Sequence, residues 1–156
     1  FMRRKCRACS STWAPFQSTS IPRPRPPIIR RSFSWTKARW PSRKLWAVFE
    51  PRSATSRRAV FQHEYLQAFR AADRVLIADV YHHREQLPTE ARFSPQILVE
   101  ALRAQGVGAW FYPTTEEIVH HLCRDAQATD VILVMSNGGF DNIHQRLLTA
   151  LEQVPT

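Results

Sequence analysis

Two short polar stretches, each after an apolar run, carry groups suited to binding anions. Arg52, Arg57 and Arg58 lie in or just after the stretch Glu50-Pro-Arg-Ser-Ala-Thr55, where a guanidinium fork can hold a carboxylate, although a solvated helix start is the alternative. The stretch Ser136-Asn-Gly-Gly-Phe140 contains two glycines that allow close backbone approach and can turn N–H groups toward an anion. A Gly-Gly pair can also simply make a turn.

A third polar stretch begins at Asp79, which ends an apolar run and either faces a ligand or caps the loop that follows. His82, His83 and Glu85 are residue types that bind metals. Adjacent histidines in a loop rarely present both rings to one ion, and a third ligand is not evident, so we interpret them as a surface loop. We expect His120 or His121 to lie at the boundary of the core and assign neither a role.

Alternating strands and helices must position these stretches. Short apolar runs predict buried strands at 45–49, 74–79, 109–112 and 130–135. Apolar spacing and capping residues predict helices over 56–71, from Ser94 (cap) and Pro95 to just before Gly106, over 115–123 and over 142–151. This alternation predicts a three-layer, Rossmann-like α/β domain with a mainly parallel sheet. Ligands then bind at the carboxyl ends of the strands, where the three polar stretches converge.

Charge divides the 156-residue chain, since residues 1–44 hold 12 of the 22 Lys and Arg and none of the 13 Asp and Glu. We expect residues 1–44 to be a disordered Arg/Pro-rich tail and residues 45–156 to be the folded domain. The tail could be a linker, or DNA translated out of frame, which we favour because evolved coding sequence rarely lacks carboxylates so completely. It could also bind RNA or single-stranded DNA through its arginines and Trp13, Trp35 and Trp40, but nucleic acid is not the partner we favour.

Cysteine usage and hydropathy narrow the setting of the protein. Cys6 and Cys9 form a lone C-x-x-C and Cys123 stands alone, which completes neither a disulfide framework nor a four-ligand zinc site. No apolar run is long enough to span a bilayer, and the tail lacks the apolar region of a signal peptide. We therefore expect a cytoplasmic protein without a membrane partner.

Three segments together resemble the C-terminal domain of the Mur ligase family, the ATP-dependent amide ligases of the bacterial cell wall. They are Leu45-Trp-Ala-Val-Phe-Glu-Pro-Arg-Ser-Ala-Thr-Ser-Arg-Arg58, Ala78-Asp-Val-Tyr81 and Val134-Met-Ser-Asn-Gly-Gly-Phe140. The resemblance covers residues 37–152. The E-P-R-S loop paired with M-S-N-G-G-F is similar to the branch that joins L-Ala-γ-D-Glu-meso-diaminopimelate to UDP-N-acetylmuramate in peptidoglycan recycling.

The resemblance implies that the domain closes over ATP and binds a muramyl peptide substrate. It makes Arg52 and Arg57 candidates for the peptide's carboxylates, with Ser53 and Thr55 as lesser polar contacts. Ser136, Asn137, Gly138 and Gly139 would form the turn at the closing edge, and Asp79 a further contact. The implied cofactors of the whole family are ATP and Mg²⁺.

Two departures from the family bear on catalysis. No segment matches the phosphate-binding G-T-x-G-K-[ST], and an Arg/Pro stretch replaces the D-D-x-x-H-H-P hinge. We therefore expect a fragment without the central and N-terminal ligase domains, which binds no cofactor alone and does not catalyse ligation. A non-catalytic α/β domain that binds a small molecule is a further alternative.

Overall fold

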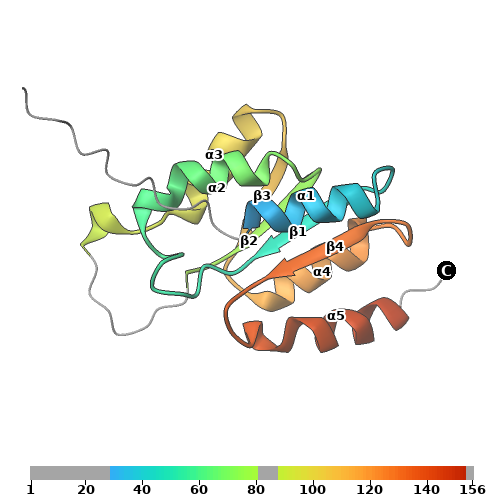
Figure 1. Cartoon of the computed structure of the whole chain (residues 1–156). Coiled ribbons are helices and arrows are strands. Elements are labelled where there is room, and N and C mark those ends of the chain that lie inside the picture. Colours follow the sequence, from blue (N-terminus) through green and yellow to red (C-terminus); the bar gives the residue numbers. More distant parts are fainter. Residues whose placement is uncertain (1–28, 81–87, 154–156) are drawn as a thin grey trace, which may run out of the picture.

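The computed structural model describes residues 29–80 and 88–153, which build a four-stranded parallel sheet between two layers of helices (Figure 1). The strand order is β3-β2-β1-β4, and every neighbouring pair is parallel. The strands are β1 (Leu45–Phe49), β2 (Arg74–Ala78), β3 (Gly108–Tyr112) and β4 (Val131–Met135). The predicted parallel α/β fold is confirmed.

The helices divide between the two faces of the sheet. One face carries α1 (Ile29–Arg39), α2 (Gln62–Phe69) and α3 (Pro95–Ala104), and the other carries α4 (Thr115–Asp125) and α5 (Ile143–Glu152). Each face has its own apolar core, because the strands send alternate side chains to opposite sides. Short 3₁₀ turns occupy Ala59–Phe61, Thr89–Ala91 and Phe140–Asn142.

Local capping explains where α3 and α4 begin. The Ser94 hydroxyl accepts a hydrogen bond from Ile97 N and Pro95 occupies the first turn, while Gly106 adopts φ 81° just beyond the end of α3. Thr114 and Glu117 cap each other's backbone at the start of α4. The predicted helix over 56–71 is shorter, because Ser53 and Ser56 form a turn of their own and α2 begins only at Gln62.

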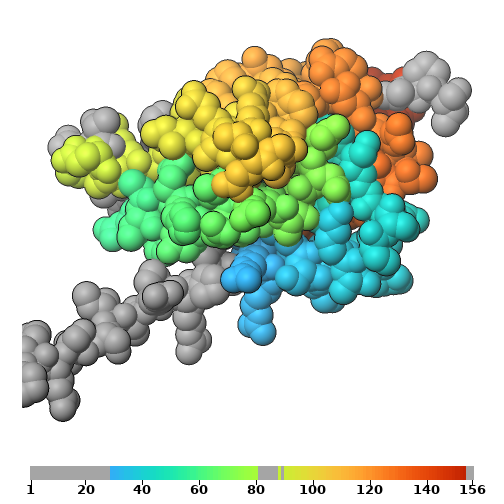
Figure 2. All heavy atoms as spheres, turned by 90° about the horizontal axis from the view of Figure 1, so that it is seen from above, coloured from blue at the N-terminus to red at the C-terminus, as the bar shows by residue number. Residues whose placement is uncertain are grey.

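The expected tail over residues 1–44 is wrong for its last part, because α1 belongs to the folded domain. Phe33 is fully buried with its ring 5.5 Å from that of Phe69, and Lys37 Nζ lies 2.5 Å from Asp73 Oδ2. Figure 2 shows the α1 segment, in blue, packed along the outside of the domain. Residues 1–28 lie outside the described residues, so their predicted disorder stays a prediction.

The strand order creates a switch point between β1 and β4. From β1 the chain builds outward through β2 to β3, and then crosses to the other side of β1 to form β4. The connections leaving β1 and β4 therefore diverge to opposite faces, and this is the position where open α/β sheets bind ligands at the carboxyl ends of their strands. Phe49 and Met135 are paired in register, so Glu50 and Ser136 begin their loops side by side.

Candidate functional site

Glu50 and Ser136 join the two loops at this switch point. Glu50 N donates to Met135 O at 3.0 Å, which carries the pairing of the strands one residue into the loop. The Ser136 hydroxyl donates to Glu50 Oε2 at 2.5 Å, and Glu50 is only 8% exposed. A buried carboxylate needs such partners, because an unpaired charge is costly to remove from water. The pair therefore holds both loops at one place.

Arg52 extends this junction toward residues 136–139 (Ser-Asn-Gly-Gly), the glycine turn that follows β4. Its Nη1 lies 3.5 Å from Glu50 Oε1, so Glu50 contacts Ser136 with one oxygen and Arg52 with the other. A Cβ atom on Gly138 would lie 2.4 Å from both Cδ and Nε of Arg52. The Arg52 side chain thus crosses over Gly138 and occupies the place where any other residue would carry a side chain.

The turn after β4 has an unusual backbone. Gly138 N donates to the Ser136 hydroxyl at 3.1 Å, and Gly139 adopts right-handed angles (φ −69°, ψ −18°) directly before Phe140, which has φ 41°. A right-handed residue followed by a left-handed one turns successive N–H groups toward one side, a geometry that loops use to bind anions. Asn137, Gly138 and Gly139 are all exposed at this edge.

Ser53 and Arg57, also predicted from the first loop, make contacts that shape this loop. Ser53 Oγ accepts from Ser56 N at 3.0 Å, and Arg57 Nε donates to Ser53 O at 3.4 Å. Arg57 is 8% exposed, and its carbonyl accepts from Phe93 N, which ties the loop to the start of α3. Thr55 is exposed in the same turn. Of the predicted residues in this loop, the structure brings Arg52 to the glycine turn and gives Ser53 and Arg57 contacts that shape the loop.

Asp79 lies across β1 from the glycine turn, at the end of β2. Its N donates to Tyr112 O at 3.1 Å, and its Oδ1 accepts from Val80 N at 2.7 Å, so it caps the start of its own loop. His82, His83 and Glu85 lie outside the described residues. Within the described ranges, no three residues of the metal-binding types His, Cys, Asp and Glu gather closely enough to hold an ion.

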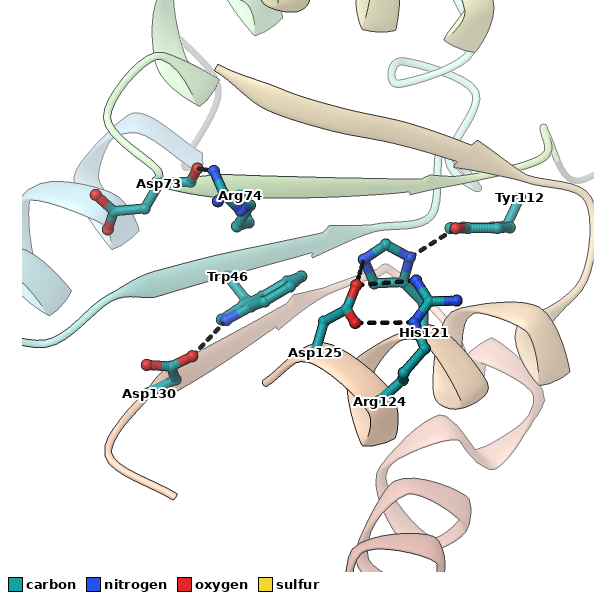
Figure 3. A network of polar contacts seen from close by, with 8 residues as sticks. All are labelled: Trp46, Asp73, Arg74, Tyr112, His121, Arg124, Asp125 and Asp130. Atoms are coloured by element: carbon teal, nitrogen blue, oxygen red, sulfur yellow. Dashed lines mark hydrogen bonds and ion pairs between the residues drawn. The ribbon is translucent and has the colours of Figure 1, made fainter. Parts of the chain in front are cut away.

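A second polar network lies on the α4 face of the sheet (Figure 3). His121 is 2% exposed, and its Nδ1 is 2.6 Å from the Tyr112 hydroxyl. Its Nε2 is 3.3 Å from Asp125 Oδ2, but without hydrogen-bond geometry. Burial lowers the pKa of His121, against the nearby charge of Asp125. Since Trp46 and Trp110 pack against the ring, we interpret His121 as a core residue.

Glu50 was not among the site residues predicted from the sequence, although Glu50 links Arg52 to Ser136 in the structure. The available signal was a carboxylate directly after a fully apolar strand. That signal identifies a partner only once β4 is known to lie beside β1.

Curated relatives found by sequence are ligases, and no family model matches the chain. The chain is 31% identical over 111 residues to the UDP-N-acetylmuramate–L-alanine ligase of Acetivibrio thermocellus, covering 71% of this chain and 23% of that protein. It is 29% identical over 128 residues to the enzyme of the same name from Pelobacter propionicus, covering 82% and 27%. The chain thus spans about a quarter of the length of these relatives.

Solved structures show the same similarity. A murein peptide ligase from Psychrobacter arcticus matches with a TM-score of 0.68 at 31% identity, over 84% of this chain and 26% of that one. The second match is a domain described as part of a UDP-N-acetylmuramate:L-alanyl-γ-D-glutamyl-meso-diaminopimelate ligase from Haemophilus ducreyi. Its TM-score is 0.59 at 28% identity, over 81% of this chain and 83% of that one.

The extent of the matches bears on where the domain begins. Residues 45–156 number 112, or 72% of the 156 residues, whereas the match to the Pelobacter propionicus protein covers 82%. That match must therefore include at least 16 of the residues before Leu45. Together with the packing of Phe33, this makes α1 part of the shared fold.

Proposed function

The chain is a homologue of the Mur ligases with the fold of their C-terminal domain, and we propose that it provides the peptide-binding edge of an ATP-dependent amide ligase. The proposed reaction joins L-Ala-γ-D-Glu-meso-diaminopimelate to UDP-N-acetylmuramate, the compounds named for the ligase to which the similar Haemophilus ducreyi domain belongs. The similar Psychrobacter arcticus protein is named a murein peptide ligase. The E-P-R-S and M-S-N-G-G-F segments support the tripeptide over L-alanine as the incoming substrate. We also propose a place in peptidoglycan recycling and in the cytoplasm.

The observation that carries the proposal is the position of Arg52 across the glycine turn. A guanidinium binds a carboxylate through two parallel N–H donors, and the incoming tripeptide has several carboxylates. Glu50 holds the Arg52 side chain at the switch point, so the guanidinium is positioned before the substrate arrives. The N–H groups around Gly139 would meet a second anionic group, either another carboxylate or the acyl phosphate.

The chemistry of such a ligase limits what this domain can contribute. When bound, ATP with Mg²⁺ supplies the phosphoryl group that activates the muramate carboxyl for attack by the peptide amine. The 156 residues contain no G-T-x-G-K-[ST] segment, and the described residues offer no group of metal ligands. We therefore assign this domain substrate binding and orientation, with phosphate and metal binding left to other domains.

A hybrid enzyme tests the proposal. The chain from Ile29 onward would replace the C-terminal domain of the Psychrobacter arcticus ligase, and phosphate release would be followed with UDP-N-acetylmuramate and either the tripeptide or L-alanine. We expect ATP-dependent joining of the tripeptide, and Arg52→Ala should raise its KM by about tenfold to a hundredfold, the loss expected for a charged hydrogen-bonding partner. The exposed Arg58→Ala is the matched control. Activity with L-alanine alone would reassign the substrate, and no activity from a folded hybrid would reject the proposal.

A further inference from the structure

The glycine turn continues into a left-handed segment. Phe140, Asp141 and Asn142 have φ values of 41°, 45° and 54°, so three consecutive residues other than glycine lie in the left-handed region. Asn and Asp tolerate this conformation better than most residues, whereas a bulky aromatic residue does not. The turn can persist only because neighbouring contacts hold it, and these contacts decide where Gly138 and Gly139 lie.

One of these contacts is apolar and one is ionic. The Phe140 side chain is 2% exposed and belongs to the core formed by α4 and α5, beside Ile118 and Ile143. The second is Arg146, which projects from the first turns of α5 and forms ion pairs with Asp141 and with Glu116. Glu116 lies in the first turn of α4, next to Thr114 and Glu117. The reciprocal hydrogen bonds of these two residues make the start of the helix rigid.

We propose that Arg146 is a positioning residue, which links the left-handed turn to the start of α4 and so fixes Gly138 and Gly139 at the substrate edge. The inference rests on the proposed function, because the edge matters only if a substrate binds there. An isolated exposed ion pair contributes little, but here one planar guanidinium, itself 32% exposed, serves two carboxylates from separate elements. Loss of that link would lower the fraction of molecules with the binding-competent turn, and apparent affinity falls with that fraction.

The first experiment uses the whole chain and needs no ligase activity. Amide resonances of residues 138–142 and their hydrogen exchange would be compared by NMR in Arg146→Gln, Arg146→Lys and the parent. We expect Arg146→Gln to shift the Gly138 and Gly139 resonances and to speed exchange in the turn by about threefold to tenfold, the range set by two weak ion pairs. Arg146→Lys should give an intermediate effect, since an ammonium group retains the charge but not the planar fork that serves two carboxylates.

Two controls separate the ion pairs from a general loss of stability. Asp141→Asn removes one pair while keeping a residue that tolerates the left-handed region, and should reproduce part of the effect. Arg70→Gln makes the same change at an exposed arginine on the opposite layer of the fold and should leave residues 138–142 unchanged. If Arg146→Gln leaves the resonances and exchange of the turn unchanged, the inference is wrong, whatever the hybrid enzyme does.

The second experiment concerns substrate binding in the hybrid enzyme. Arg146→Gln should raise the KM for the tripeptide by about threefold to tenfold with kcat within about twofold, and Arg146→Lys should give an intermediate KM. An unchanged KM despite a loosened turn would overturn the positioning role. A hybrid that is folded but inactive would reject the proposed function, and the NMR comparison would still decide whether Arg146 holds the turn.

Discussion

Arg52 crosses Gly138 so closely that its Cδ and Nε occupy the space of a side chain at that position, 2.4 Å from where a Cβ would lie. The two residues belong to loops that follow different strands, and the Glu50–Ser136 hydrogen bond holds these loops together. Position 138 therefore needs glycine because the Arg52 side chain fills the space of a Cβ atom there, and not because of the backbone conformation of the turn.

This relationship predicts that the two adjacent glycines differ. In Gly138→Ala the new methyl group must displace the flexible Arg52 side chain, so peptide binding in the hybrid should weaken by about tenfold while stability changes by less than about 1 kcal/mol. Gly139→Ala should be neutral, because a Cβ there meets open space and φ is −69°. Calorimetric titration and urea unfolding measure both quantities. Equal effects of the two substitutions would contradict the prediction.

Glu50 should be important for stability as well as for the site. In Glu50→Ala the Ser136 hydroxyl loses its acceptor and Arg52 loses a carboxylate, so the free energy of unfolding should fall by about 1–3 kcal/mol. Glu50→Gln keeps an oxygen acceptor for Ser136 and should cost less. Urea unfolding followed by tryptophan fluorescence checks this order. A Glu50→Gln variant as unstable as Glu50→Ala would mean that the charge, rather than the hydrogen bond, holds the loops.

The start of the folded domain can be tested through α1. Phe33→Ala should lower the free energy of unfolding by about 3–5 kcal/mol, because the ring is fully buried against Phe69. Trp35→Ala is the matched control, since Trp35 is 65% exposed on the same helix and should cost less than about 0.5 kcal/mol. Removal of residues 1–28 should leave the transition intact, whereas removal of residues 1–44 should abolish it. Cooperative unfolding of a chain that begins at Leu45 would restore the boundary predicted from composition.

His121 predicts how stability depends on pH. Burial lowers its pKa below the ordinary value of 6.5, so the folded state binds this proton more weakly than the unfolded state. The contribution is fully present above pH 6.5 and is lost as the pH falls from there through the lowered pKa of the folded state. The urea midpoint should decline as the pH is lowered from 7.5 to 4.5, and the urea midpoint of the His121→Gln variant should decline less over the same range. A parallel decline in both proteins would exclude His121 as the cause.

Stability should decline again at lower pH for a different reason. Burial alone would raise the pKa of Asp73, but hydrogen bonds from the Lys37 side chain and from Leu45 N lower it below 3.8. The Arg124 hydrogen bond lowers the pKa of Asp125 below 3.8. Such carboxylates stabilise the fold above the unfolded value and lose this contribution as the pH falls through the lowered pKa. Asp73→Asn should flatten the profile below about pH 4 while leaving the His121 window unchanged.

The composition of residues 1–28 leads to a prediction about the gene. We propose that these residues are translated out of frame, since they contain six Lys and Arg and five Pro but no Asp or Glu. Resequencing should then show another frame that encodes a D-D-x-x-H-H-P hinge and, further upstream, a phosphate-binding loop. A single confirmed frame without these segments would refute this proposal.

The sequence by itself determined the elements whose signals are local. Three of these signals lie within a few residues of the structure they specify. They are Ser94 with Pro95, the Thr114–Glu117 pair, and the fully apolar strand before Glu50. The helix α1 escaped prediction because its eleven residues bury only Phe33 and Thr36, and its arginines and Trp35 resemble the stretch before it. Its helical state depends on the surface of α2, which no local signal describes.

The tertiary structure alone decided how the candidate site is assembled. Ser136 and Glu50 are 86 residues apart, and they meet only because β4 crosses over to pair with β1 rather than with β3. A pattern of alternating strands and helices is compatible with several strand orders, and each order would place different loops side by side. The ion pair of Arg146 with Glu116 likewise depends on how α4 and α5 are placed in the fold. Residue types alone could therefore suggest an anion site, but they could not show which residues hold that site in place.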